Sequence, residues 1–251
     1  MHEKSLRIEH VLELISWKKA FCYFRKINWS YRVTDFYRAE ALKIIFSELK
    51  GKLLDFGCGS KPYLAALKTD QITDWVGADL KSRTTGHGSE NAADLFLENG
   101  KIPCKNGMFD LVLSTQVLEH VDLWEEAILE FHRVLKTGGL GIVTIPMSSI
   151  LHEIPYDFHR FTPYGFQKSI ERNGFRLVRA VALGGVITFL GTIFCNHINF
   201  IMKLPLLGKV IHAFCVLLAT STSLYLEVLA FSLGYKRSTI TSDYLFLIRK
   251  I

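Results

Sequence analysis

From Lys52 onward, short apolar runs of strand length alternate with segments of helical pattern. Such alternation predicts βαβ units, and therefore an α/β fold with a doubly wound, mainly parallel sheet. Helices are expected at about 122–135, ending at Gly138-Gly139, and at about 163–173, and a weaker strand at 91–94. The clear predicted strands are LLDF (53–56), WVGAD (75–79), FDLVLS (109–114), LGIVTIP (140–146), 175–183 and DYLFLIRK (243–250).

Charge is distributed unevenly and divides the chain into three parts. Residues 1–50 are basic and predict a helical cap of two helices, the second over about 33–49. Residues 51–251 hold the α/β pattern, and within them 184–236 form an apolar helical insertion with few charges. The first helix of the cap is indicated by Leu6, Val11, Leu12 and Ile15 at helical spacing.

Composition excludes several classes of protein. The 251 residues are 49% apolar and 22% charged, which excludes a disordered or collagen-like chain. The net charge of +6 suits an anionic ligand or a membrane surface, but it is too scattered to indicate a nucleic-acid partner. Five cysteines without a CxxC pair predict neither a zinc ribbon nor a disulfide framework. The N-terminal stretch has no uninterrupted apolar core, so we expect no signal peptide and a cytoplasmic location, peripheral on the inner face of the membrane.

A glycine-containing turn follows the first predicted strand. Gly57 and Gly59 allow the backbone to pass close under a ligand, and Asp79, at the end of the next strand, can accept the hydroxyls of a ribose. These features alone indicate a nucleoside-containing cofactor, which includes NAD(P). The dinucleotide fingerprint is incomplete because Pro62 stands at its third glycine position. Asp55, two residues before Gly57, would repel a pyrophosphate and suits the cationic amino group of a methionine moiety.

Four stretches, in order and at matching spacing, resemble the motifs of class I S-adenosylmethionine-dependent methyltransferases with a type-11-like domain. They are LLDFGCGSKPY, VGADL, FDLVLSTQVLEHV and LKTGGLGIVTIP. The resemblance covers roughly residues 50–180 and implies a seven-stranded sheet of order 3-2-1-4-5-7-6 whose last strand is antiparallel. It also implies S-adenosyl-L-methionine as the cofactor. A third glycine of the family motif is replaced in the GSKP stretch, which leaves the path of the loop open.

The resemblance carries cofactor roles to particular positions. Asp55, Gly57 and Gly59 would form the loop around the methionine part, and Asp79 would hold the ribose. The remaining cofactor-binding positions would be Asp94 and Leu95 beside the adenine and Gln116 on the outer face of the cofactor. Some ubiquinone-type O-methyltransferases resemble the stretch around Gln116 but have a carboxylate there that helps hold a divalent ion. Gln116 removes such a charged ligand, so we expect no metal in this site.

Candidate catalytic and acceptor-binding residues follow the fourth and fifth strands. His120 and His159 are the candidate catalytic residues, with a helix-packing role as the alternative for His120. Tyr156 and Arg160 are the candidate acceptor-binding residues, with pairing to Asp157 as the alternative for Arg160. If His159 takes part in the reaction, its replacement by alanine should lower turnover far more than cofactor affinity. Thr162 and Pro163 are expected to begin the next helix.

The apolar insertion admits three interpretations. Residues 180–202 and 210–226 carry no charge, so they could form a helical pair that dips into a membrane surface, a dimer interface or internal lid, or true membrane spans. Residues 17–26 mix aromatic and basic side chains, as interfacial segments do. Together these features favour the membrane surface, with a homodimer through the insertion as a further option.

The sequence therefore predicts an S-adenosylmethionine-dependent methyltransferase that acts on a small or lipid-linked acceptor at or near the membrane surface. One alternative is a non-catalytic, membrane-associated module that binds the cofactor. An NAD(P)-type oxidoreductase is a second alternative, because nicotinamide enzymes use a similar sheet. A nucleic-acid acceptor is not expected, since no basic stripe with interleaved aromatics appears outside residues 17–29.

Overall fold

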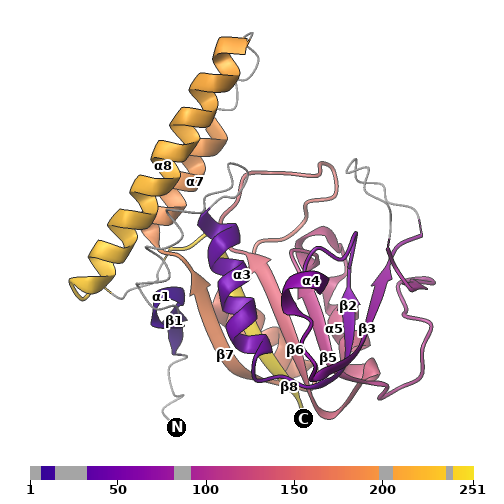
Figure 1. Cartoon of the computed structure of the whole chain (residues 1–251). Coiled ribbons are helices and arrows are strands. Elements are labelled where there is room, and N and C mark those ends of the chain that lie inside the picture. The colour runs from indigo at the N-terminus through magenta and orange to yellow at the C-terminus, as the bar shows by residue number, and fades with distance from the viewer. Residues whose placement is uncertain (1–6, 15–32, 82–91, 198–205, 236–239) are drawn as a thin grey trace.

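The computed structural model describes residues 7–14, 33–81, 92–197, 206–235 and 240–251. Its centre is an eight-stranded sheet of order β1-β7-β8-β6-β5-β2-β3-β4 (Figure 1). Only β8 runs antiparallel to its neighbours, β6 and β7. The strands are β1 (Ile8–His10), β2 (Gly51–Phe56), β3 (Ile72–Asp79), β4 (Leu95–Phe96), β5 (Phe109–Thr115), β6 (Leu135–Pro146), β7 (Phe175–Leu183) and β8 (Asp243–Lys250).

The expected strand order is confirmed, but the expected number of strands is one too low. From β4 to β7 the sheet has the order implied by the family resemblance, including the antiparallel β8. The eighth strand is β1, which pairs in parallel with the outer edge of β7 through Ile8↔Ala180 and His10↔Ala182. We expected a helix here. Three residues instead pair with β7 as a short edge strand. The helix that follows, α1 (Val11–Leu14), is only one turn long.

Helices cover both faces of the sheet and divide the core in two. On one face lie α3 (Val33–Phe46) and the short α4 (Leu64–Leu67), whose buried side chains include Tyr37 and Leu67. On the other face lie α5 (Trp124–Val134) and α6 (Pro163–Arg172), with Phe131 and Phe166 among the fully buried side chains. Both faces of the central strands are therefore buried, which explains why their sequences are nearly continuous apolar runs.

Several element boundaries differ from those expected. The strand β6 begins at Leu135, where α5 ends, and Gly138-Gly139 lie in an irregularity of its pairing with β5. The weak strand expected at 91–94 is not found at 92–94; β4, which pairs with the end of β3, follows directly at Leu95–Phe96, and residue 91 lies outside the described residues. At α6 the expectation is confirmed: Thr162 Oγ1 accepts the amide of Gly165, and Pro163 is the first helical residue.

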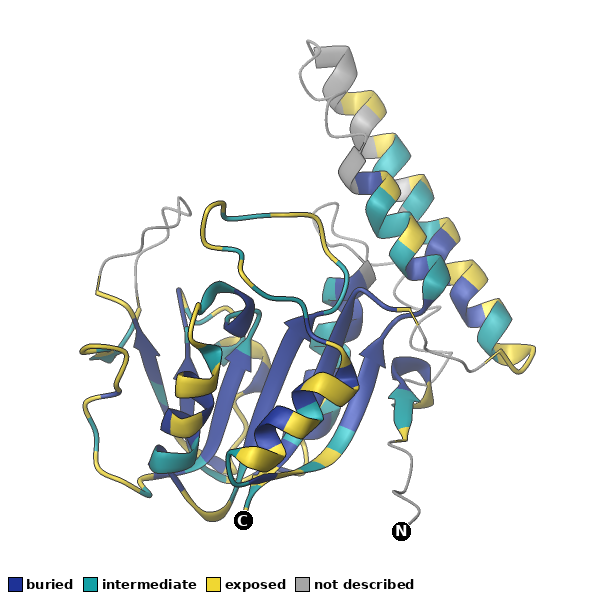
Figure 2. Ribbon diagram, turned by 180° about the vertical axis from the view of Figure 1, so that it is seen from behind, coloured by how far each residue is buried: buried dark blue, intermediate teal, exposed yellow. Residues whose placement is uncertain are grey.

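The apolar insertion forms a helical hairpin between β7 and β8. The helices α7 (Val186–His197) and α8 (Leu206–Ser232) pack against each other and extend away from the sheet (Figures 1 and 2). Gly191 allows their close approach, because a Cβ there would lie 2.0 Å from Ser223 Oγ. At the base of the hairpin, buried Glu227 lies 3.0 Å from His10 Nε2 and accepts the amide of Thr188. Polar contacts thus fix the base, while many apolar side chains toward the tip are exposed.

Candidate active site

A cavity of about 840 Å³ lies at the carboxyl ends of β2, β3 and β5, where ligands bind in open α/β sheets. Its wall brings together seven of the eleven site residues expected from the sequence: Asp55, Gly57, Gly59, Asp79, Gln116, His120 and Tyr156. The other four, Asp94, Leu95, His159 and Arg160, are not part of that wall. Residues that sequence reasoning missed also line it, including Arg38, Tyr63, Leu97, Gly100, Leu123, Glu153 and Phe158.

The loop after β2 forms the floor of this cavity. Gly57 has φ +70°, and a Cβ there would meet Val117 Cγ2 at 2.5 Å, so the position excludes every side chain. Lys61 also has a left-handed backbone, with φ +54°. It lies in the GSKP stretch, so the loop keeps a turn that favours glycine even though a lysine occupies it. The helix α4 (Leu64–Leu67) follows this loop.

Asp79 holds this loop in place from the end of β3. Its Oδ2 accepts the amide of Gly59 at 2.8 Å, and its Oδ1 accepts the amide of Leu80 at 2.8 Å. Asp79 also lines the cavity. Asp79 is 8% exposed. It therefore combines a structural contact with a place on the cavity wall.

Asp55 lies at the buried end of the cavity. It is 2% exposed, and its Oδ2 accepts a hydrogen bond from Trp75 Nε1 at 3.1 Å. Burial raises the pKa of Asp55 to about 7, against the lowering effects of the Trp75 hydrogen bond and the Lys61 charge. A cation that reached this carboxylate would relieve the cost of its burial. Asp55 thus suits a positively charged group of a ligand, as the sequence indicated.

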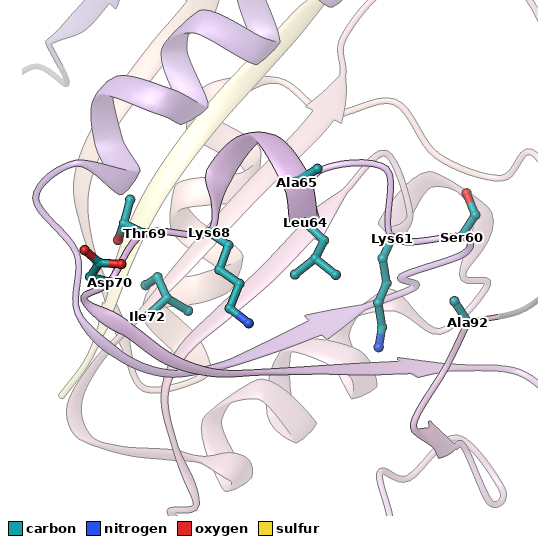
Figure 3. Close-up of a pocket in the computed structure, with 9 residues that line it drawn as sticks. All are labelled: Ser60, Lys61, Leu64, Ala65, Lys68, Thr69, Asp70, Ile72 and Ala92. Carbon is teal, nitrogen blue, oxygen red and sulfur yellow. The ribbon is translucent and has the colours of Figure 1, made fainter.

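Asp94 has partners other than a ligand. Its Oδ2 lies 2.5 Å from Lys61 Nζ and accepts the amide of Gly77 at 2.7 Å. These bonds lower its pKa although its partial burial opposes them. Figure 3 shows Lys61 extending from the loop toward the strands, where it lines a second, more open pocket beside α4. The nearby wall of the main cavity is formed by Leu97 and Gly100, which no sequence motif marked.

Gln116 and His120 follow β5 on the opposite wall. Gln116 has φ +54°, its amide donates to Thr144 O at 2.9 Å, and its side chain lies 3.4 Å from Thr144 Oγ1. His120 Nδ1 lies 2.7 Å from the carbonyl oxygen of Tyr156. Because a carbonyl oxygen can only accept, Nδ1 carries the proton of a neutral His120 ring. The loop after β6 is thereby tied to this wall.

The remaining expected residues order that loop. His159 Nε2 lies 2.9 Å from Asp122 O. Arg160 makes two hydrogen bonds to Asp157, at 2.5 and 2.6 Å, and a longer one to Ile150 O. Burial alone would raise the pKa of Asp157, but the Arg160 hydrogen bonds and charge outweigh it and lower the pKa to about 2. These contacts match the alternative interpretation of Arg160, in which it pairs with Asp157.

Replacement of Arg160 by alanine should therefore act mainly on stability. Asp157 is 2% exposed, and Arg160→Ala would leave its charge buried without its main partner. We expect a loss of about 2–3 kcal/mol, below the full cost for a completely buried pair because Arg160 is 25% exposed. Thermal unfolding measures this loss. Arg172→Ala is the matched control, because Arg172 is 69% exposed beside Glu125 and should cost under about 1 kcal/mol. Equal effects of the two substitutions would contradict this role.

Arg38 is a cavity residue that the sequence did not single out. It comes from α3, in the basic N-terminal part, and donates to Asp35 Oδ1 at 3.0 Å and to Asp243 Oδ2 at 3.2 Å. Arginine is common on helices, so a single one in a helical pattern carries no signal of its own. Only the packing of α3 over the sheet brings it to the cavity. Residues 33–46 thus contribute directly to the candidate site.

Comparisons with known proteins agree with the fold. Residues 54–143 match the family model described as a methyltransferase domain. The chain therefore contains a class I S-adenosylmethionine-dependent methyltransferase domain, and S-adenosylmethionine is the cofactor of that class. An S-adenosylmethionine-dependent methyltransferase of Mycolicibacterium smegmatis is 28% identical over 138 residues, which are 53% of this chain and 51% of the relative.

A second relative and two solved structures extend the comparison. An uncharacterized protein of Methanocaldococcus jannaschii is 38% identical over 146 residues, which are 55% of this chain and 63% of that protein. The chain thus spans between half and two thirds of the length of these two relatives. The [4+2]-cyclase SpnF has a TM-score of 0.51 at 14% identity, with 97% of each chain covered. A methyltransferase in complex with the Haloferax volcanii Trm112 activator also has a TM-score of 0.51 at 14% identity, over 98% of this chain and 99% of that one. These two structures show a shared fold only.

Proposed function

We propose that this protein transfers the methyl group of S-adenosylmethionine to a small or lipid-linked acceptor at a membrane surface. The observation that carries the transfer is the convergence of Asp55, Gly57 and Asp79 on one cavity at the ends of β2 and β3. A dinucleotide enzyme would place a pyrophosphate against this loop, where the Asp55 carboxylate would repel it. A cofactor with a cationic amino acid group fits the same position.

Particular residues would hold the cofactor. Asp79 would accept the ribose hydroxyls, and the Gly57–Gly59 turn would lie under the methionine part, whose amino group would approach Asp55. Gln116 would border the cofactor on the β5 side. Leu97, not the expected Asp94 or Leu95, would be the apolar side chain nearest the base, because Leu97 lines the cavity and the other two do not.

The bound cofactor supplies an activated methyl group, and the chain's main task is alignment. Holding two reactants in line contributes roughly 7–11 kcal/mol to such a reaction. The loop after β6 would hold the acceptor opposite the cofactor, since Tyr156 and Phe158 line the cavity there. Of the two expected catalytic histidines, His120 borders the cavity and His159 does not. We therefore place His120 beside the acceptor and assign His159 to loop ordering.

Exposed apolar side chains around the cavity support an apolar acceptor. Leu80, Leu123, Tyr156 and Phe158 line it and are between 38% and 61% exposed. Leu151 and Ile154, in the loop after β6, are 68% and 72% exposed. A lipid-linked acceptor could reach the cofactor between these side chains without full transfer into water.

The α7–α8 hairpin supports attachment to a membrane. Its helix α8 contains one segment long and apolar enough to cross a bilayer, Phe214–Ser232, of which 25% is buried. However, the hairpin begins at the carboxyl end of β7, the same edge of the sheet as the cavity, and its base is held by buried Glu227. A hairpin that lies in the membrane surface is consistent with its apolar helix and also with a base that stays attached to the domain beside the cavity. The basic and aromatic stretch at 17–26 lies outside the described residues.

Cofactor affinity should depend on pH through Asp55. Without ligand, the Asp55 carboxyl holds a proton below its pKa of about 7, and a cationic ligand must displace that proton. We therefore expect the affinity for S-adenosylmethionine to fall by up to about tenfold per pH unit below pH 7, and to level off above it. Calorimetric titration between about pH 5.5 and 8.5, a range that brackets the pKa of Asp55, measures this change in affinity.

Asp55→Asn is the matched variant for the pH experiment. It should bind more weakly at pH 8, with little change toward acid pH, because it has no proton to displace. S-adenosylhomocysteine carries the same amino group and should give the same pH profile as S-adenosylmethionine. A steep profile that persists in Asp55→Asn would assign the titration to another group.

Transfer itself is tested with labelled S-adenosylmethionine and membrane lipid extracts. Label should enter the organic phase with wild-type protein and not with Asp79→Ala. Cofactor binding without any labelled product, from lipid or small-molecule extracts, would favour the non-catalytic module.

A further inference from the structure

Glu119 is a buried acid in the turn that follows β5. Its side chain is 0% exposed, and neither oxygen accepts a hydrogen bond from another residue in the described part of the chain. The positive charges of Arg38 and Arg160 act on it, but their guanidinium groups are bound to Asp243 and Asp157, and the Asp243 charge opposes them. A buried acid in this state is costly unless something neutralises it. The proposed transfer uses no such acid.

Two imidazole rings stand beside this carboxylate. His120 Nε2 lies 3.9 Å from Glu119 Oε1, and the His120 and His152 rings meet edge to face with centroids 4.9 Å apart. One ligand atom from each of Glu119, His120 and His152 can be chosen so that all three lie within 4.8 Å of one another. The three come from the turn after β5 and from the loop after β6.

Both rings are oriented by hydrogen bonds to their other nitrogen. His120 Nδ1 lies 2.7 Å from Tyr156 O, and His152 Nδ1 lies 3.1 Å from Ile150 O. Both Nδ1 atoms must donate to these carbonyl oxygens, so each neutral ring has its lone pair on Nε2. The buried Asp157 carboxylate lies 3.4 Å from His152 Nδ1. Such outer contacts, from carbonyl or carboxylate to the second nitrogen, accompany metal-binding histidines.

We propose that Glu119, His120 and His152 form a binding site for a divalent transition-metal ion of the zinc type. Two imidazole nitrogens and one carboxylate form a donor set that suits zinc or iron better than magnesium or calcium. This proposal departs from our expectation of no metal, which rested on the absence of a carboxylate at position 116. The proposed site does not depend on methyl transfer, because the evidence for it is the three donor side chains and the hydrogen bonds that orient the two histidine rings.

The geometry requires a small inward movement. Donors at zinc bond lengths of about 2.0–2.2 Å lie about 3.4 Å apart at a tetrahedral angle, so separations of up to 4.8 Å must shorten by up to about 1.4 Å. His152 can make this movement, because it lies in a loop and its side chain is 36% exposed. Three protein donors leave a position for water or another oxygen ligand. Because His120 also lines the cavity, the ion would stand at the cavity wall.

Metal titration of the full-length protein tests this site. After treatment with a chelator, wild-type protein should bind one equivalent of Zn²⁺ by calorimetry, with micromolar or tighter affinity. Co²⁺, a coloured probe, should give the visible absorption of a low-symmetry nitrogen and oxygen site. Zn²⁺ should also raise the thermal unfolding temperature of wild-type protein, since a ligand of the folded state stabilises it.

Substitutions separate this site from adventitious binding. His152→Ala and Glu119→Gln should each weaken Zn²⁺ binding by at least about tenfold, a lower bound set by the effect of losing even an outer contact. His159→Ala is the matched control, because His159 lies in the same loop on a backbone carbonyl but outside the cluster, and it should bind as wild type does. S-adenosylmethionine affinity reports whether each variant is folded.

Two results would overturn the site. One is a wild-type protein that binds S-adenosylmethionine but not Zn²⁺ or Co²⁺. The other is a His152→Ala variant that binds Zn²⁺ as tightly as His159→Ala. If Glu119→Gln fails to fold, His152→Ala still decides, because its position is partly exposed. Failure of cofactor binding alone would count against the proposed function and leave the metal site standing.

Discussion

Asp79→Ala is expected to reduce the affinity for S-adenosylmethionine by at least about 100-fold. The substitution removes the acceptor proposed for the ribose hydroxyls and also the bonds from the amides of Gly59 and Leu80. A hydrogen bond to a charged group contributes about 1.5–3 kcal/mol, and each 1.4 kcal/mol is a factor of ten. Two lost ribose contacts alone reach that effect. Calorimetric titration at pH 8, or a thermal shift with added cofactor, measures it.

Asp110→Ala is the matched control for this experiment. Asp110 is also at a strand end and accepts a backbone amide, that of Lys52 at 2.9 Å, as well as Lys136 Nζ. It lies at the start of β5, at the opposite edge of the sheet from the cavity. Asp110→Ala should cost stability and leave cofactor affinity unchanged. If the two variants bind the cofactor equally well, Asp79 does not hold the ribose.

Phe214→Glu together with Leu218→Glu should detach the protein from lipid vesicles. The two side chains lie one turn apart on α8 and are 62% and 57% exposed. Burial of each in a membrane surface would contribute about 1.5–3 kcal/mol, so their joint loss should lower partitioning by about 100-fold or more. Cosedimentation with vesicles of mixed neutral and anionic phospholipids measures the change. Cofactor affinity should not change, since neither residue lines the cavity.

Leu129→Glu together with Ile251→Glu is the control for the hairpin. These residues are 52% and 74% exposed and lie on α5 and at the end of β8, so the change in charge and apolarity is matched outside the hairpin. This variant should bind vesicles as wild type does. If the hairpin variant instead keeps its vesicle binding and changes from dimer to monomer in sedimentation, the exposed face is a subunit interface.

The central fold was predictable because both faces of its strands are covered. Burial of the central residues of β2, β5 and β6 gives short, continuous apolar runs, which are recognisable without knowledge of their neighbours. The edge of the sheet was not predictable in this way. β1 has three residues, and its pairing with β7 depends on a segment about 170 positions away in the chain. Local spacing of Leu6, Val11 and Leu12 favoured a helix there instead.

The candidate site was predictable where its residues are fixed by their position at the end of a strand. The glycines after β2 and the acid that ends β3 lie at fixed positions relative to their strands, so a local motif locates them. Asp94 shows the limit of this approach, because its neighbour Lys61 binds it and Leu97 takes the place on the cavity wall. Arg38 and His152 come from distant parts of the chain, and only the packing of α3 and of the loop after β6 brings them near the site.

The edge strand β1 also limits how the chain can be shortened. A polypeptide that starts at Val33 would keep the matched domain but lose His10, and with it the contact to Glu227 at the foot of α8. It would also uncover the edge of β7 at Ala180, Val181 and Ala182, which could then pair with another molecule. Removal of the residues before Val33 would thus both loosen the hairpin and promote self-association.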